Sequence, residues 1–541
     1  MNGKPSRRPR LVCAALAVLA AGAGAAGQVV VPPNVGVPSG IAPHPTADYE
    51  AALADLAEGD LAAALQQATD EYVGCTKFGN QRWIDTIAGA AIVGECQYER
   101  GDFVRAIAAY DEALAIAAQN PEWLLAVQFP AQPPRPAGGG RVATWGRSGR
   151  NTSPAQLPDV VAIRMQGPDP QEVLQRGGVL AAPFDLQIRP QEIMRSLVMA
   201  LYRRAEILGP LGHEAATVDG VARGLARRPA PPNHWSQAWI DVAHGTALWA
   251  QGKPEQAAPA LARGLTMGQG LDHALTPWAL IVLGRIALDA DRAAEAARQF
   301  EEATYAAAEF GDARALEEAF RLAFAAHMLA GTRGAPATIR AASDSPLLRD
   351  GLDVLRVRLL AMSAEALAAA GDARAAAATL KEIPQRLLRG PAQGAAAAEA
   401  AYAAAVASYA SGDIAGGDAN LDRALAAARA RSTRLFRTAR LVEVVTAGSS
   451  VSDRQAETLF TSLLGPPTPR DFGVDPLETL ACVTAPRQEA FDAWIAVAAR
   501  RGVERANDAV LDPVEAARRD RWLVARRLGG RVVAAERLLT A

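Results

Sequence analysis

Apolar and small residues recur at helical spacing along most of the chain. In residues 101–120, Ala106, Tyr110 and Ala113 fall on one helix face, because positions i, i+4 and i+7 lie above one another. A Gly-Asp pair separates this segment from the preceding one, which carries Gly94 near its middle. The pattern predicts two helices joined by a tight turn, with Tyr110 filling the space that the small residue leaves.

The same pattern returns further along the chain. The predicted turns have a regular spacing of about 40 residues where they are adjacent, and they fall at Gly59, Gly101, Gly252, Asp291, Gly331, Gly371 and Gly412. The best second copy carries Gly284, Ala296, Phe300 and Ala303 in the corresponding positions, whereas the unit that turns at Gly331 departs most from the pattern.

This set of small and aromatic residues across a helix–turn–helix resembles the tetratricopeptide repeat family. The resemblance covers roughly two-thirds of the chain after the N-terminal leader. It implies an all-α fold, a tetratricopeptide-like α-solenoid whose first helices line a concave surface. The period exceeds the usual 34 residues of this family and would also suit HEAT-type repeats, but the Gly-Asp turns and the small-residue positions favour the tetratricopeptide type.

The first residues predict export. The cationic MNGKPSRRPR precedes the short apolar LVCAALAVLAAGAGA, an arrangement typical of a secretory signal peptide. We expect a signal peptide at residues 1–27 and an extended linker at 28–46, with the mature protein periplasmic or extracellular. The leader leaves open whether export uses the general or the twin-arginine route.

The repeats divide into two blocks. We expect tetratricopeptide-like repeats at residues 47–121 and a longer solenoid at 191–465. Between them, residues 122–190 form a non-repeat insertion with two short β-type runs, WLLAVQF and VVAIRMQ, and a possible β-hairpin. Residues 466–541 begin with a Pro-rich turn and are expected to form a helical C-terminal cap.

The composition agrees with a helical protein and excludes some partners. Hydrophobic residues make up 50% of the chain and aromatic residues 5%, so alanine, the best helix former, supplies much of the apolar content. The 56 Lys and Arg residues balance 58 Asp and Glu residues. Because these charges balance, the chain has no strong electrostatic field to attract phosphates, and we expect no nucleic-acid partner. No segment after the leader is long and apolar enough to predict a membrane span.

Motifs for catalysis or cofactor binding are absent from the sequence. It contains no G-x-S-x-G, Walker lysine loop, G-x-G-x-x-G or H-E-x-x-H. His234 and His244 are ten residues apart, about 15 Å along a helix, and no Cys–His spacing resembles a zinc site. The leader aside, the cysteines are Cys75, Cys96 and Cys482, which we expect to be buried and unpaired. We therefore expect no enzyme, metal or cofactor.

The inner face of the solenoid is the expected binding surface. Aromatic and arginine side chains are enriched at binding hot spots. Residues of these types, with two glutamates, fall at outward positions of the first helices and are the candidate partner-binding residues: Tyr98, Glu99, Trp239, Trp249, Trp278, Arg285, Arg358, Glu365, Tyr402 and Tyr409. The alternative is that bulky side chains fill gaps between repeats.

Two arginine-rich stretches offer a further surface. Arg431, Arg434, Arg437 and Arg440 recur every three residues, and five arginines crowd residues 518–527. They could contact an anionic envelope surface, or they could form solvated helix faces with carboxylate partners.

Together these features predict a non-enzymatic, exported scaffold that binds protein or peptide segments or assembles an envelope complex. It resembles exported bacterial repeat proteins of unassigned role. Two alternatives remain: an envelope protein that binds a glycan or small ligand in an aromatic-lined groove, and an enzyme with an unfamiliar site in residues 122–190 or in the C-terminal cap.

Overall fold

The computed structural model describes residues 43–78, 80–138, 143–165, 184–331, 337–349, 351–388, 394–448, 451–465, 467–502, 510 and 513. The expected signal peptide, nearly all of the expected linker and the arginines within 518–527 lie outside the described residues.

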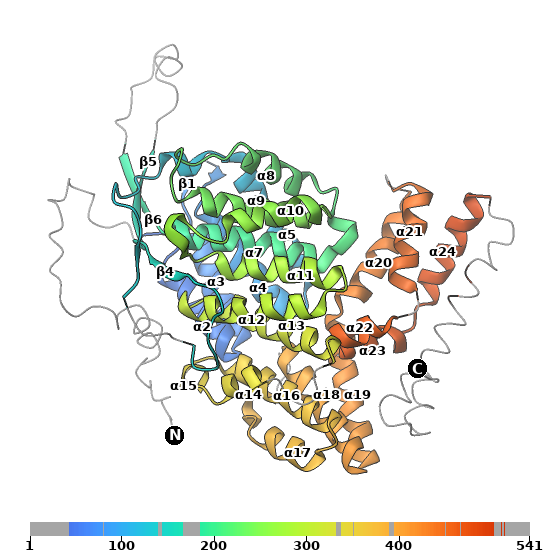
Figure 1. The fold of residues 1–541 in the computed structure, drawn as a ribbon. Helices are drawn as coiled ribbons and strands as arrows, with labels where there is room; N and C mark the ends of the chain where they lie inside the picture. Colours follow the sequence, from blue (N-terminus) through green and yellow to red (C-terminus); the bar gives the residue numbers. More distant parts are fainter. Residues whose placement is uncertain are drawn as a thin grey trace, which may run out of the picture.

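The chain forms an all-α solenoid of tetratricopeptide-like helix pairs, to which a few short strands are added (Figure 1). Its first half contains α2 (Ala47–Glu58), α3 (Leu61–Gly74), α4 (Thr86–Glu99), α5 (Phe103–Gln119), α7 (Pro190–Leu208), α8 (Ala216–Ala226), α9 (Gln237–Ala250), α10 (Pro254–Gly264), α11 (Thr276–Asp289) and α12 (Ala293–Glu309). Its second half contains α13 (Ala313–Leu329), α14 (Ala337–Ser343), α15 (Pro346–Arg349), α16 (Asp353–Ala369), α17 (Ala373–Lys381), α18 (Ala395–Ser411) and α19 (Ile414–Arg431).

The predicted turns lie where the sequence places them. All seven predicted turn residues adopt positive φ values, a conformation that glycine reaches without the steric cost of a Cβ. At Gly412, with φ of 89°, the chain leaves α18, and Asp413 then caps α19 by accepting from the Gly416 backbone N–H. Asp102 caps α5 in the same way. The Gly-Asp pair thus ends one helix and begins the next.

Small residues bring paired helices together, as the sequence predicts. A Cβ built on Gly94 of α4 would lie 2.5 Å from the ring of Tyr110 in α5, and one built on Gly284 of α11 would lie 2.4 Å from Phe300 in α12. Both rings are fully buried. Each aromatic side chain therefore occupies space that only a glycine in the partner helix leaves open.

The segment between α5 and α7 carries most of the strands. β5 (Val161–Met165) and β6 (Phe184–Ile188) pair antiparallel, with Val161 opposite Ile188. β3 (Arg135–Pro136) pairs with β4 (Ser153–Gln156), which runs parallel to β7 (Leu271–Asp272). The remaining strands, β1 (Lys77–Phe78) and β2 (Gln81–Arg82), form a separate two-stranded sheet.

This segment is attached to the solenoid by buried side chains. The indole N–H of Trp145 donates to the Thr304 hydroxyl over 3.0 Å, and its ring packs against Phe320. Arg150 makes a bidentate ion pair with Asp272. The segment is therefore packed along the outside of α12 and α13.

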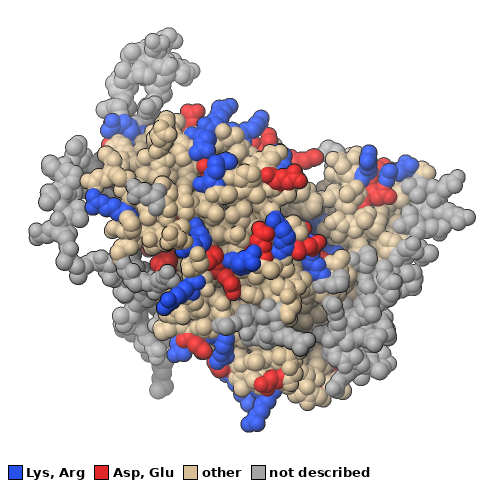
Figure 2. Space-filling view, in the orientation of Figure 1, with Lys and Arg blue, Asp and Glu red and all other residues tan. Residues whose placement is uncertain are grey.

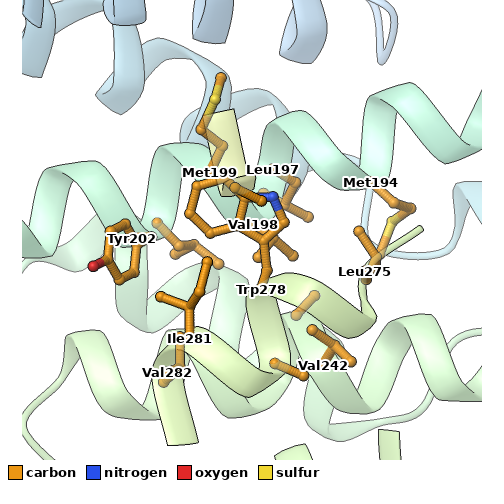
Figure 3. Packing of buried hydrophobic residues seen from close by; sticks show 14 of the residues in the cluster. Met194, Leu197, Val198, Met199, Tyr202, Val242, Leu275, Trp278, Ile281 and Val282 are labelled. Carbon is orange, nitrogen blue, oxygen red and sulfur yellow. The ribbon is translucent and has the colours of Figure 1, made fainter. Parts of the chain in front are cut away.

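The main core runs through the middle of the solenoid. Figure 3 shows Trp278 of α11 surrounded by Leu197 and Val198 of α7 and by Ile281 of its own helix. Trp278 is fully buried, and so is Tyr202, whose ring centroid lies 5.3 Å away. First helices of successive pairs therefore pack against one another in this core.

A second group of helices follows the solenoid: α20 (Thr433–Thr446), α21 (Asp453–Leu464), α22 (Pro469–Val474), α23 (Pro476–Thr484) and α24 (Gln488–Arg500). In Figure 1, α20, α21 and α24 stand beside the solenoid, and they enclose a small core with Leu441, Phe460 and Trp494. In the described part of the chain, no helix has the length and apolar character needed to cross a bilayer.

Candidate functional site

The inner face of the solenoid carries a group of buried charged side chains, here called the central charge cluster. Its members come from four helices of the solenoid, and most of them are almost completely buried. They are Glu95 and Glu99 of α4, Arg203 and Glu206 of α7, Arg314, Glu317, Glu318 and Arg321 of α13, and Arg358 of α16.

Arg203 lies at the centre of the cluster. Its Nε lies 3.3 Å from both carboxylate oxygens of Glu95, and its Nη1 lies 2.7 Å from Glu206 and 3.2 Å from Glu318. The guanidinium carbon also sits 4.5 Å from the ring centroid of Tyr98. Arg203 therefore joins α4, α7 and α13, using the several donors that its planar head offers.

The cluster also joins the two ends of the solenoid. Arg314 donates to Glu99 over 3.1 Å, and Arg358 lies 2.7 Å from Glu317. Arg431, at the end of α19 and 332 residues after Glu99, donates to both the backbone carbonyl and the carboxylate of Glu99. The inner face is therefore closed by ion pairs between distant repeats.

A cavity of about 120 Å³ lies beside these ion pairs and is partly open to solvent. Since a water molecule occupies about 30 Å³, it could hold a few waters or the end of one long side chain. Six acidic and four basic side chains line it: Glu99, Glu206, Glu318, Glu399, Asp475 and Glu478, with Arg203, Arg321, Arg358 and Arg431. The lining therefore has an excess of carboxylates.

The carboxylates differ in their electrostatic surroundings. Burial alone would raise the pKa of Glu99, but Arg358, Arg314 and Arg431 outweigh it and hold that pKa at about 2. Burial and the neighbouring charge of Glu478 raise the pKa of Asp475 to about 7. Burial, with repulsion by Asp475 and Glu399, raises the pKa of Glu365 to about 8. One side of the cavity thus has carboxylates that are poorly compensated by cations.

Five of the predicted partner-binding residues lie in or near this region. Tyr98, Glu99 and Arg358 line the cavity. Arg285 lies 3.5 Å from Glu206, and Glu365 interacts electrostatically with Asp475. The structure therefore brings together the charged members of the predicted set and one tyrosine.

The other aromatic members of the set do not lie at outward positions, and this part of the prediction is wrong. Trp239, Trp278, Tyr402 and Tyr409 are buried, and Trp249 is half-buried, with its ring stacked on Tyr202 at 5.3 Å. They fill space between helices because the surrounding alanines leave gaps that large rings can occupy. Whether these residues bind a partner stays an untested prediction. Burial makes the side chains of Trp239, Trp278, Tyr402 and Tyr409 inaccessible to a partner.

The first arginine-rich stretch is neither a solvated face nor an anion-binding surface. Arg437 donates to the backbone carbonyls of Glu206 and Ile207 at the end of α7, where the helix presents unpaired carbonyl groups. Arg434 donates to the Leu463 carbonyl, and only Arg440 remains exposed, paired with Glu443. These arginines attach α20 to the solenoid and to α21.

Most of the cluster was not predicted from the sequence, including Glu95, Arg203, Arg314 and Glu318. A signal exists for Arg203, because it directly follows the apolar run LVMALY within a predicted helix. Charged residues at such positions are rarely buried unless they are paired. Nothing in the sequence identifies their partners.

Comparison with known proteins assigns no family. No family model matches the chain, and no curated protein matches it. Among solved structures, a monomeric mutant of IFIT1 with Gppp-AAAA is 12% identical, covering 83% of this chain and 89% of that one at a TM-score of 0.31. A second IFIT1 mutant with m7Gppp-AAAA gives the same values. A circular tandem repeat protein is 12% identical at a TM-score of 0.15, covering 91% and 85%. At such TM-scores the neighbours carry no information about ligands, and the fold follows from the helix pairs of this structure.

Proposed function

We propose that this protein is a non-enzymatic, exported scaffold of bacterial origin that binds protein segments, and that the central cavity receives a cationic side chain of the partner. The observation that carries the proposal is the excess of carboxylates around the cavity, with Asp475 beside Glu478 on the side that arginines compensate least. An ammonium or guanidinium group would supply the missing charge and donate hydrogen bonds to these carboxylates.

The surroundings favour a protein segment over a nucleic acid or a membrane. Acidic and basic side chains are interspersed over the face seen in Figure 2, and the chain has a formal net charge of −2. Binding of nucleic acid needs a basic surface that neutralises phosphates. Recognition therefore depends on a local site, such as the central cavity, and not on a general field.

Export is the second part of the proposal, and it is supported by the cationic and apolar leader of the sequence. We expect the protein isolated from the cell envelope to begin between residues 24 and 28. N-terminal sequencing of that protein tests this, and an intact Met1 on envelope-derived protein would contradict it.

The cavity is tested with peptides and a single conservative substitution. We expect Lys- or Arg-containing peptides selected from an array to bind the full chain, and Asp475→Asn to weaken that binding about tenfold, the loss expected when a charged hydrogen-bond acceptor becomes neutral. Asn still caps helices well. We also expect tighter binding at pH 8 than at pH 6, because raised carboxylate pKa values keep these groups protonated at the lower pH. Calorimetry measures both effects.

Asp413→Asn is the matched control, because Asp413 caps α19 in the same way but is exposed and does not line the cavity. Equal effects of the two substitutions, or no preference for cationic peptides, would contradict the proposal. An open groove beside Trp235, lined also by Arg228, Asn233 and Gln237, offers the glycan-binding alternative. Glycan binding that is lost in Trp235→Ala would favour that alternative instead.

A further inference from the structure

A group of side chains of the types that can ligate metals lies at the beginning of the solenoid, away from the central cavity. His44 precedes α2, Glu71 and Cys75 lie at the end of α3, and Asp85 precedes α4. The sequence predicts no metal site, because these residues do not follow a known metal-binding spacing. The helix pairs nevertheless bring all four side chains to one place.

The possible donor atoms of three of these residues are close to one another. One ligand atom each from His44, Glu71 and Cys75 lie within 4.8 Å of one another. His44 Nδ1 is 3.5 Å from Glu71 Oε1 and 3.9 Å from Asp85 Oδ2. Tetrahedral zinc bonds of 2.0–2.3 Å would need these atoms to move together by about 1 Å.

The side chains are held in place by contacts that leave possible ligand atoms available. Glu71 Oε2 accepts from the backbone N–H and the hydroxyl of Thr46, while Oε1 faces His44. The backbone carbonyl of His44 accepts from the Arg189 N–H over 2.8 Å. Such outer contacts orient ligands in many metal sites.

Asp85 provides an independent observation. Its side chain is fully buried beside His44, and its Oδ2 accepts from the Thr76 N–H over 2.7 Å. Its Oδ1 is also buried and has no hydrogen-bond partner in the part of the chain that the structure describes. A buried acceptor without a partner is costly, and a bound cation would remove this cost.

The charges of the cluster also favour a cation. Glu71 is 1% exposed and Asp85 is fully buried, so two carboxylates share the single histidine as their closest titratable cation. Buried carboxylates are normally paired or coordinate metals.

We propose that His44, Glu71 and Cys75 bind a divalent transition-metal ion, with the neighbouring Asp85 carboxylate adding negative charge beside the site. The mixture of imidazole, thiolate and carboxylate donors fits zinc best. Binding displaces the thiol proton of Cys75. The ion would connect the segment before α2 to the end of α3 and the beginning of α4, and through the backbone of His44 to β6.

Cobalt binding tests this proposal, because Co²⁺ occupies zinc sites and is coloured. We expect one equivalent of Co²⁺, added to chelator-treated full-length protein, to produce visible bands of tetrahedral cobalt and a near-ultraviolet thiolate band. Zinc should displace it. Cys75→Ser should abolish the thiolate band, and His44→Ala should weaken binding at least tenfold. Cys482→Ser is the control, because Cys482 is a buried free cysteine in α23.

Several outcomes would overturn the proposal. They are the absence of stoichiometric cobalt binding by the wild-type chain, retention of the thiolate band in Cys75→Ser, and its loss in Cys482→Ser. His44 is only half-buried, so the His44→Ala protein should keep its helical circular dichroism. Unchanged metal affinity in this folded variant would also contradict the assignment.

Discussion

Substitution of Arg203 by alanine is expected to lower the free energy of unfolding by about 3–5 kcal/mol, the usual cost of removing one partner from a buried ion pair. Glu95 and Glu318, both almost fully buried, would lose their contacts with this guanidinium. Urea denaturation followed by circular dichroism measures the loss. We also expect increased proteolysis between the repeats, because Arg203 joins α4 to α13 across the inner face.

The control is Arg105→Ala, because the Arg105 side chain is 72% exposed and pairs with Asp102 in its own turn. An exposed pair contributes less than about 1 kcal/mol. A combined Arg203→Met, Glu95→Gln and Glu318→Gln variant should recover part of the stability, because it leaves fewer buried charges without partners. If Arg203→Ala and Arg105→Ala cost the same, the central charge cluster does not hold the inner face closed.

The repeat architecture could be predicted because its signals are local. Gly371 and Gly412 mark turns by their backbone conformation, and Gly94 with Tyr110 marks a close helix contact within a single pair. Each signal involves residues that lie close together in the sequence, within one helix pair. Helical periodicity in the sequence is therefore sufficient to identify the helices and their pairing.

The central cavity could not be predicted in the same way. Its ion pairs join residues separated by 108 positions for Glu95 and Arg203 and by 332 positions for Glu99 and Arg431. Whether two such residues meet depends on the small rotation between successive repeats, added over the whole solenoid. The cluster around His44 could not be predicted either, because a segment outside the repeats supplies one of its possible ligands.

The aromatic residues show how a correct helix assignment can still give a wrong surface. The sequence places Trp239 and Trp278 in first helices, and the structure agrees, but α9 and α11 are covered by neighbouring helices on nearly every side. Amphipathic patterning does not distinguish an inner face that is open to solvent from one that is closed. Substitution of these tryptophans is consequently expected to change the stability of the fold.

Substitution of Trp278 by alanine is expected to lower the free energy of unfolding by about 3–5 kcal/mol, as for other large-to-small changes in cores. The indole is fully buried, and Figure 3 shows it packed against Leu197 and Val198 of α7. Its Nε1 donates to Asp312 Oδ2 over 2.9 Å, and Asp312 in turn caps α13. The loss therefore includes a cavity and a weakened helix cap, and urea denaturation of purified protein measures it.

Two further variants separate these contributions. Trp278→Phe keeps much of the ring volume but removes the N–H donor, and since Arg195 still lies 3.4 Å from Asp312 Oδ2, we expect a cost of about 1–2 kcal/mol. Trp249→Ala removes a half-buried ring and should cost less than Trp278→Ala. A Trp278→Ala protein as stable as wild type that nevertheless lost a bound partner would show instead that this residue belongs to a binding surface, because a buried core ring cannot be removed without a loss of stability.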